Sequence, residues 1–258
     1  MTELADCLLT LIKSTLLAGM LAAICWSQDA LAQSLRVEPI GTEITQNELA
    51  EITRTVAYQR RKLQKLYGQA VNDTVYAKVF GDFGEFSDYT VACCDFQPIS
   101  TAYFNEKASE LVVFKNEEFM KALGHELCHA LTAKRRIKNH PWLDEGLADV
   151  LSAKRVLPGG KLSEQLLYYG NNLKAINTPK IKSLMAADRE KWQQMTNADS
   201  YAMSWAVVNF LNFRHPALLS RILLAADEQT EITEVIETHH KGGLKAFIKS
   251  MRAFYRSK

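Results

Sequence analysis

The segment from His125 to Asp149 constrains the fold of this chain more than any other stretch. It opens with HELCH and closes with WLDEGLAD, which begins thirteen residues after His129. Residues four apart lie on one face of an α-helix, so His125 and His129 can reach one metal ion if HELCH is helical. A surface helix that carries two histidines without a metal is the simpler alternative. The metal interpretation predicts a fold that packs two helices together around this pair.

Acidic side chains in the same segment complete a candidate metal site. Glu126 lies about 100° around the helix from His125, where its carboxylate can reach a water beside the metal rather than the metal itself. Zinc in a catalytic site takes three protein ligands and keeps an open position, and Glu145 on the second helix can supply the third. Asp149, one turn further on, can accept the free N–H of a ligating histidine. A solvated acidic helix start is the alternative for these two acids, but their apolar neighbours disfavour it.

Hydrophobic spacing divides the rest of the chain into a small α/β part and a helical part. β-rich stretches predict strands or extended chain at 75–80, 89–104 and 111–114. Helical spacing predicts helices at 46–67, 117–133 (with Asn116 as N-cap), 143–156, 161–170, 179–194, 199–213, 216–226, 231–239 and 243–256. This order predicts an α+β fold class, in which a small mixed or antiparallel sheet precedes a helical C-terminal part.

The N-terminal residues are typical of a secretory signal peptide. An apolar run at 16–26 follows Lys13 and precedes Ala30-Leu31-Ala32, the small residues that a signal peptidase requires. The run is shorter than the roughly 20 residues of a membrane span, so we expect no stable membrane span after cleavage behind Ala32. The mature protein is then periplasmic or extracellular. An uncleaved N-terminal anchor is the alternative, because two acidic residues precede the run.

The chain is therefore expected to have three parts. Residues 1–32 are the signal peptide, 33–134 are an N-terminal α/β subdomain that ends in the HELCH helix, and 135–258 are a helical subdomain that contains Glu145. The whole chain carries 31 basic and 29 acidic residues, and this net charge of +2 gives no electrostatic case for a nucleic-acid partner. The basic run 134–138 is most simply a solvated helix end.

Removal of the signal peptide leaves three cysteines, Cys93, Cys94 and Cys128. An exported protein can form disulfides, so a bond from Cys93 or Cys94 to Cys128 is one arrangement. A buried free thiol at Cys128 is the other, and the spacing does not fix the distances that would decide between them.

HELCH followed by WLDEGLAD resembles the gluzincin zinc metallopeptidases, most closely their peptidase-MA-like branch, over residues 75–215. YAMSW at 201–205 is similar to a Y-x-x-S-W element that these proteins carry on a later helix. The resemblance implies a zincin-like fold. It also implies one Zn²⁺ ion per chain, held by His125, His129 and Glu145.

The same resemblance assigns the remaining roles. Glu126 becomes the general base, and Asp149 becomes the hydrogen-bond partner of a histidine ligand. Tyr201 is the first candidate donor to the oxyanion, with a tyrosine packed in the core as the alternative. The strand at 111–114 is expected to be the edge strand that borders the cleft and pairs with an extended substrate.

Two functions are compatible with these residues. The first is a secreted or periplasmic zinc-dependent peptidase that hydrolyses peptide bonds of a peptide or protein substrate with an activated water. The second is a catalytically silent, zinc-stabilised binding or adaptor module of the same fold. A competent residue at every catalytic position favours the enzyme.

The other histidines have smaller roles in this interpretation. His140 and His215 are weaker oxyanion candidates, and His239 and His240 are most simply surface residues. The sequence sets no oligomeric state.

Overall fold

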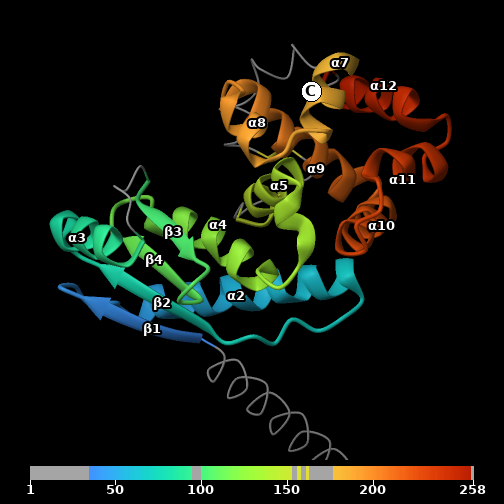
Figure 1. Cartoon of the computed structure of the whole chain (residues 1–258). Helices are drawn as coiled ribbons and strands as arrows, with labels where there is room; N and C mark the ends of the chain where they lie inside the picture. Colours follow the sequence, from blue (N-terminus) through green and yellow to red (C-terminus); the bar gives the residue numbers. More distant parts are fainter. Residues whose placement is uncertain (1–34, 95–99, 153–155, 158–160, 163–176, 257–258) are drawn as a thin grey trace, which may run out of the picture.

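The computed structural model describes residues 35–94, 100–152, 156–157, 161–162 and 177–256. The predicted signal peptide 1–32 and most of the predicted helix 161–170 lie outside the described residues. The described chain is a mixed α+β structure, with a four-stranded sheet in its first half and helices after it (Figure 1). The predicted fold class is thus confirmed.

The sheet contains three parallel strands and one antiparallel edge strand. Its order is β1 (Leu35–Ile40), β2 (Val75–Phe80), β4 (Glu110–Phe114) and β3 (Ala102–Asn105). β1 and β4 run parallel to β2, whereas β3 runs antiparallel to β4. β1 is not evident in the sequence, because only Leu35 and Val37 of its residues pack against the main core.

β4 is an inner strand, which corrects the expectation that 111–114 forms the edge of the sheet. It lies between β2 and β3, and its residues from Glu110 to Val113 are all buried. Strands buried on both faces have continuous apolar sequences, as ELVVF does. The sheet ends in β1 on one side and in β3 on the other, next to β4, and the central residues of β3, Tyr103 and Phe104, are only half-buried.

Three helices cover the sheet: α2 (Gln46–Tyr67), α3 (Phe83–Cys94) and α4 (Phe119–Thr132). Successive residues of a strand point to opposite faces, which shows where each helix packs. Leu111 and Val113 of β4 belong to the main core with α2 and α4. Val112 between them belongs to a smaller cluster with Phe86 of α3. α2 and α4 therefore cover one face, and α3 covers the other.

α2 and α4 are confirmed where the sequence predicts them. α2 starts with a capping box formed by Thr45 and Glu48 and ends at Gly68, whose φ of 70° suits a glycine. α4 begins at Phe119 with Glu118 as its N-cap residue, so Asn116 is not the N-cap. Asn116 instead accepts a hydrogen bond from the Glu118 backbone N–H, at 3.0 Å, just before the helix.

α3 corrects the prediction of extended chain from residue 89 onward. Its sequence is rich in aromatic and β-branched residues, which favour strands. However, Phe86 and Thr90 lie four residues apart and are both fully buried, so the segment has an apolar helical face for the sheet. Packing against the sheet thus overrides the local strand preference.

The second half of the described chain is helical apart from one short strand pair. Its elements are η1 (Arg136–Asn139), α5 (Pro141–Ser152), β5 (Val156–Leu157), β6 (Lys161–Leu162), α7 (Thr178–Met185), α8 (Arg189–Gln194), η3 (Ala198–Ala202), α9 (Met203–Arg214), α10 (Pro216–Asp227), α11 (Ile232–His239) and α12 (Gly243–Arg256). α7 and α8 replace the single helix predicted at 179–194, because Asp188 caps a new helix. Strand β6 occupies the start of the predicted helix 161–170. Among the described helices, none is long and apolar enough for a membrane crossing.

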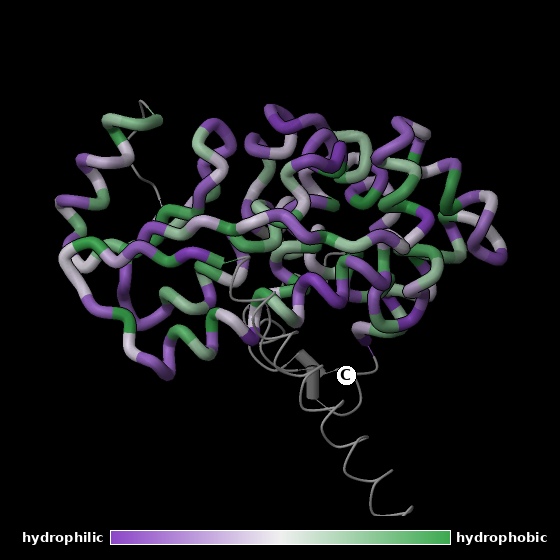
Figure 2. The backbone as a smooth tube through the Cα atoms, turned by 90° about the horizontal axis from the view of Figure 1, so that it is seen from below, coloured by the Kyte–Doolittle hydropathy of each residue, from purple (hydrophilic) through white to green (hydrophobic). Residues whose placement is uncertain are grey.

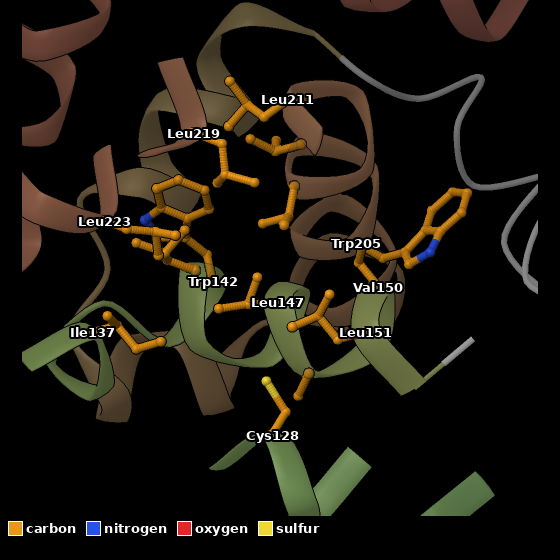
Figure 3. Packing of buried hydrophobic residues seen from close by; sticks show 14 of the residues in the cluster. Cys128, Ile137, Trp142, Leu147, Val150, Leu151, Trp205, Leu211, Leu219 and Leu223 are labelled. Atoms are coloured by element: carbon orange, nitrogen blue, oxygen red, sulfur yellow. The ribbon is translucent and has the colours of Figure 1, made fainter. Parts of the chain in front are cut away.

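The core of the helical part forms around α5. Trp142 and Leu147 of α5 and Trp205 of α9 are fully buried there (Figure 3). Hydrophobic and hydrophilic residues alternate along the helices in Figure 2, as expected of helices with one buried face. α12 is a clear case, with buried residues at Leu244, Phe247, Ile248, Met251 and Phe254.

Candidate metal centre

α4 and α5 bring together three side chains that could hold a metal ion, His125, His129 and Glu145. The Nε2 atoms of the two histidines are 3.2 Å apart. Oε2 of Glu145 lies 3.3 Å from Nε2 of His125 and 3.7 Å from Nε2 of His129. Tetrahedral zinc ligands at about 2.0–2.1 Å from the ion are about 3.3–3.4 Å from one another. The three atoms therefore fit one face of a zinc coordination tetrahedron.

Each histidine of the group is held by its own aspartate. Oδ1 of Asp149 lies 3.0 Å from Nδ1 of His125, and Oδ1 of Asp144 lies 3.1 Å from Nδ1 of His129. A histidine that donates its Nδ1–H to a carboxylate keeps the Nε2 lone pair for a metal. The sequence points to Asp149 but not to Asp144, which directly precedes Glu145 and is buried.

The charges of the group stabilise one another. Burial by itself lowers the pKa of His125, but the hydrogen bonds with Asp149 and Glu145 outweigh it and raise the pKa to about 10. Burial also lowers the pKa of His129, but Asp144 and Glu145 outweigh it and raise this pKa well above the usual value. Burial raises the pKa of Glu145, but its contacts with the histidines bring it well below the usual value. A divalent cation binds such a donor set in place of the protons.

Arg189 is a member of the site that the sequence does not reveal. Its Nη1 donates to Oε1 of Glu145 at 2.8 Å, and its Nη2 donates to Oδ2 of Asp144 at 3.1 Å. The guanidinium comes from α8, far along the chain, so no local motif connects it with HELCH or WLDEGLAD. Because Arg189 occupies Oε1, the other oxygen of Glu145 faces the histidines.

Glu126 lies beside the metal group and next to the edge of the sheet. Burial raises the pKa of its carboxyl group, while the neighbouring charges of His125 and His129 lower it. The backbone N–H of Phe104 in β3 also donates a hydrogen bond to this carboxylate. The HELCH glutamate is thus tied to the edge strand.

The register of β3 leaves part of its backbone free on the outer side. The N–H of Phe114 donates to the carbonyl of Thr101 at 2.8 Å, so this pair is a hydrogen-bonded pair of the antiparallel ladder. Such pairs alternate with non-hydrogen-bonded ones, and Tyr103 therefore bonds to β4 as well. The backbone groups of Ala102 and Phe104 point away from β4. The Ala102 carbonyl accepts a hydrogen bond from the Ser100 hydroxyl at 2.6 Å. The Phe104 N–H is used by Glu126, which leaves the Ala102 N–H and the Phe104 carbonyl for the free edge.

Tyr201 lies in η3, a π-helical turn directly before α9. Its side chain is at the boundary of exposure, at 36%. Its ring packs edge-on against Trp192, with centroids 4.5 Å apart. Burial, together with the charges of Glu145 and Asp149, raises the pKa of its hydroxyl to about 12. The phenol is thus in the electrostatic field of the metal group, and π-helical turns are frequent at functional sites.

Close packing of α5 on α9 explains the glycine of WLDEGLAD. A Cβ atom on Gly146 would lie 2.5 Å from the carbonyl oxygen of Ser204. Ser204 also accepts a hydrogen bond from Nε1 of Trp192 at 3.3 Å, and the next residue, Trp205, is fully buried. The hydroxyl of Ser204 thus joins α9 to α8, while its backbone carbonyl lies against Gly146 of the ligand helix α5.

Gln59 of α2 links the backbones of the two ligand helices. Its Nε2 donates to the carbonyl of Gly124 at 2.6 Å and to that of Leu151 at 3.4 Å. The residue is fully buried, and Gly124 directly precedes His125. A glutamine within the apolar stripe of the helix predicted at 46–67 is the sequence signal for this role.

The cysteines do not form the bond that the sequence leaves open. Cys93, Cys94 and Cys128 are all free thiols. Cys128 is 1% exposed and packs into the core beneath α5 (Figure 3). Cys93 and Cys94 contact each other at the end of α3, with Sγ atoms 2.7 Å apart. The sheet separates the two groups, because α3 and α4 cover opposite faces.

The remaining histidines and the basic run lie apart from the metal group. His215 and His240 pack edge-on with ring centroids 5.1 Å apart, and His239 is exposed. His240 is half-buried, which corrects the expectation of a surface residue. His140 is half-buried at the start of α5.

Three cations of the basic run 134–138 pair with acidic residues. Lys134 pairs with Asp73, Arg135 with Asp227 and Lys138 with Glu106.

Comparison with known proteins adds no family to this picture. No protein-family model matches the chain, and no curated protein matches it either. The chemistry of the site is therefore argued from its residues, which form a group able to hold a metal ion beside a partly buried glutamate.

Proposed function

We propose that this protein is a zinc-dependent peptidase of the gluzincin type, which hydrolyses peptide bonds with water and uses Glu126 as its general base. We also propose that it acts in the periplasm or outside the cell, as the N-terminal signal pattern implies. One observation carries the proposal of activity. Glu126 lies next to three convergent ligand atoms and accepts a hydrogen bond from the sheet edge at Phe104.

The donor set supports zinc as the metal. Two imidazole nitrogens and one carboxylate oxygen are the three protein ligands of one class of catalytic zinc sites, which keep a fourth position open. The ligand atoms of His125, His129 and Glu145 occupy only one face of a tetrahedron. When bound, zinc supplies Lewis acidity, which polarises a carbonyl group and brings the pKa of water toward about 7.

Glu126 is suited to move the proton in this reaction. Its carboxyl group is partly buried and its pKa is raised by burial, which makes the carboxylate a stronger base for a proton of water. We expect Glu126 to take a proton from the attacking water and to deliver it to the leaving amine. The N–H of Phe104 holds the carboxylate beside strand β3.

The edge strand and Tyr201 supply the substrate contacts of this proposal. An extended peptide can pair with the Ala102 N–H and the Phe104 carbonyl, as strands add to an exposed sheet edge. A carbonyl group of the bound peptide then lies near Glu126. Tyr201 keeps its proton at neutral pH, because its pKa is about 12, and its hydroxyl can therefore donate to an oxyanion.

Metal analysis and a matched pair of glutamine variants test the proposal. Purified protein should contain about one zinc per chain, and a chelator should abolish hydrolysis of an unstructured protein until zinc is restored. Glu126→Gln should keep the zinc and lose hydrolysis. Glu118→Gln, at the exposed start of the same helix, should retain both.

The outcomes separate the two candidate functions. Hydrolysis by Glu126→Gln at the rate of the unchanged protein would refute the general-base role. A protein that holds zinc but cleaves nothing across a broad peptide library would be the zinc-stabilised binding module instead.

A further inference from the structure

We propose that Cys93 and Cys94 form a redox-active dithiol, which closes to a disulfide between neighbouring residues by exchange with a small disulfide such as oxidised glutathione. Their Sγ atoms lie 2.7 Å apart, well inside ordinary van der Waals contact. The pair ends α3, on the face of the sheet opposite the metal centre. Bond formation between these atoms requires only a small further approach.

The hydrogen bonds around the pair give the two sulfurs different roles. Nδ2 of Asn105 donates to Sγ of Cys93 at 3.7 Å, and the hydroxyl of Tyr103 lies 3.4 Å from the same sulfur. Cys94 instead donates its S–H to the hydroxyl of Tyr103 at 3.8 Å. As a thiol, Cys93 also donates to the backbone carbonyl of Thr90 at 3.8 Å. We assign Cys93 as the attacking sulfur because its contact with the Asn105 amide can stabilise a thiolate once that proton is lost. Burial and the bond with Cys93 also raise the pKa of Cys94.

Oxidised glutathione accepts the two electrons that the cysteine pair loses. The thiolate of Cys93 attacks one sulfur of oxidised glutathione, forms a mixed disulfide and releases one glutathione thiolate, which takes up a proton. Cys94 then loses its proton and displaces the second glutathione from Cys93. The two cysteines give up two electrons and two protons in total, and one oxidised glutathione becomes two reduced ones.

The resulting disulfide should be labile rather than structural. Neighbouring Cα atoms are about 3.8 Å apart, whereas ordinary disulfides join Cα atoms about 4.4–6.8 Å apart. A ring closed over a single peptide bond is therefore strained, and strained disulfides are easily reduced. Both cysteines are half-buried and so within reach of a small thiol, unlike Cys128, which is 1% exposed.

The dithiol is connected to the strand that holds Glu126. Tyr103 and Asn105, which contact the sulfurs, belong to β3. Phe104 lies between them and donates its backbone N–H to Glu126. Closure of the disulfide changes the partners of Tyr103 and Asn105, so we expect it to alter the backbone of β3. The importance of this link for catalysis rests on the proposed peptidase function, but the thiol chemistry does not.

Thiol labelling of the full chain tests the pair without any measurement of hydrolysis. The protein is equilibrated with mixtures of oxidised and reduced glutathione, blocked with N-ethylmaleimide and digested with trypsin. Residues 79–107 contain no lysine or arginine before Lys107, so both cysteines stay on one peptide. We expect this peptide to carry two labels in reducing mixtures. In oxidising mixtures it should carry none and be lighter by two hydrogen atoms.

Single variants test the order of the two steps. Cys94→Ser should stop at a mixed disulfide between Cys93 and glutathione. Cys93→Ser should react with oxidised glutathione about tenfold more slowly, because the attacking sulfur beside the Asn105 amide is lost. Cys128→Ala is the control and should leave the pair unchanged. Equal rates for Cys93→Ser and Cys94→Ser would overturn the assigned order.

Two further results would overturn the rest of the proposal. Two labels on the 79–107 peptide in every mixture, or a crosslink to Cys128, would show that the pair is not a redox dithiol. Amide hydrogen exchange of residues 102–105 should differ between the oxidised and reduced protein. Identical exchange would refute the connection to β3.

Discussion

The guanidinium group of Arg189 donates to Oε1 of Glu145 at 2.8 Å, across 44 residues of sequence. The same group donates to Oδ2 of Asp144 at 3.1 Å, and Asp144 in turn holds His129. One side chain from α8 therefore orients a metal ligand on α5 and, through Asp144, a second ligand on α4. The affinity of the site should depend on this arginine even though it offers no atom to a metal.

We expect Arg189→Ala to weaken zinc binding about tenfold, because Glu145 and Asp144 lose the group that fixes their orientation. Arg189→Lys should recover little of this loss, since an ammonium group cannot bridge both carboxylates as the planar fork does. Competition with a chromogenic chelator measures the affinity. Lys191→Ala in the same helix, where the lysine pairs with the exposed Asp188, is the matched control. An unchanged affinity in Arg189→Ala would contradict the orienting role.

The two aspartates that hold the histidines should contribute separately to zinc affinity. Asp144→Asn and Asp149→Asn each remove one carboxylate from a histidine Nδ1, and we expect each to lower zinc affinity about 10–100-fold. The same chelator competition measures both. Asp73→Asn removes an exposed aspartate that pairs with Lys134 and should bind zinc normally. If Asp144→Asn behaved like Asp73→Asn, Asp144 would have no role in positioning His129.

Two helical glycines give a matched test of the packing of α5 on α9. Gly146→Ala should destabilise the protein by about 1–3 kcal/mol, because its Cβ would lie 2.5 Å from the carbonyl oxygen of Ser204. A Cβ on Gly124 would meet nothing closer than 3.6 Å, so Gly124→Ala should be neutral or stabilising by up to about 1 kcal/mol. Urea unfolding followed by circular dichroism measures both free energies. Equal stability of the two variants would contradict the close approach of the helices.

Zinc should stabilise the folded protein, because its ligands come from two helices that only the fold brings together. At a free zinc concentration about 100 times the dissociation constant, the expected gain is about 2.7 kcal/mol. Thermal unfolding with and without a chelator measures it. His129→Ala should lose this zinc-dependent gain. The same gain in the variant would mean that zinc binds elsewhere.

Local sequence was enough to predict the elements that carry their own signals. The helix 46–67 is bounded by a capping box at Thr45 and a glycine at Gly68, and the strand 75–80 alternates between buried and exposed residues. HELCH is on a helix, as its spacing predicts. Prediction failed at 89–94, where extended chain is expected but contact of Phe86 and Thr90 with the sheet produces the end of helix α3.

The sequence by itself determined the fold class and the three side chains that could hold a metal, because helical periodicity and ligand spacing are local properties. The tertiary structure decided which groups support them. Asp144 and Arg189 reach the site because α5 packs beside α4 and α8 packs beside α5. Phe104 reaches Glu126 because β3, not β4, lies at that edge of the sheet. These contacts join residues that are distant along the chain, and only the packing of the folded protein sets their distances.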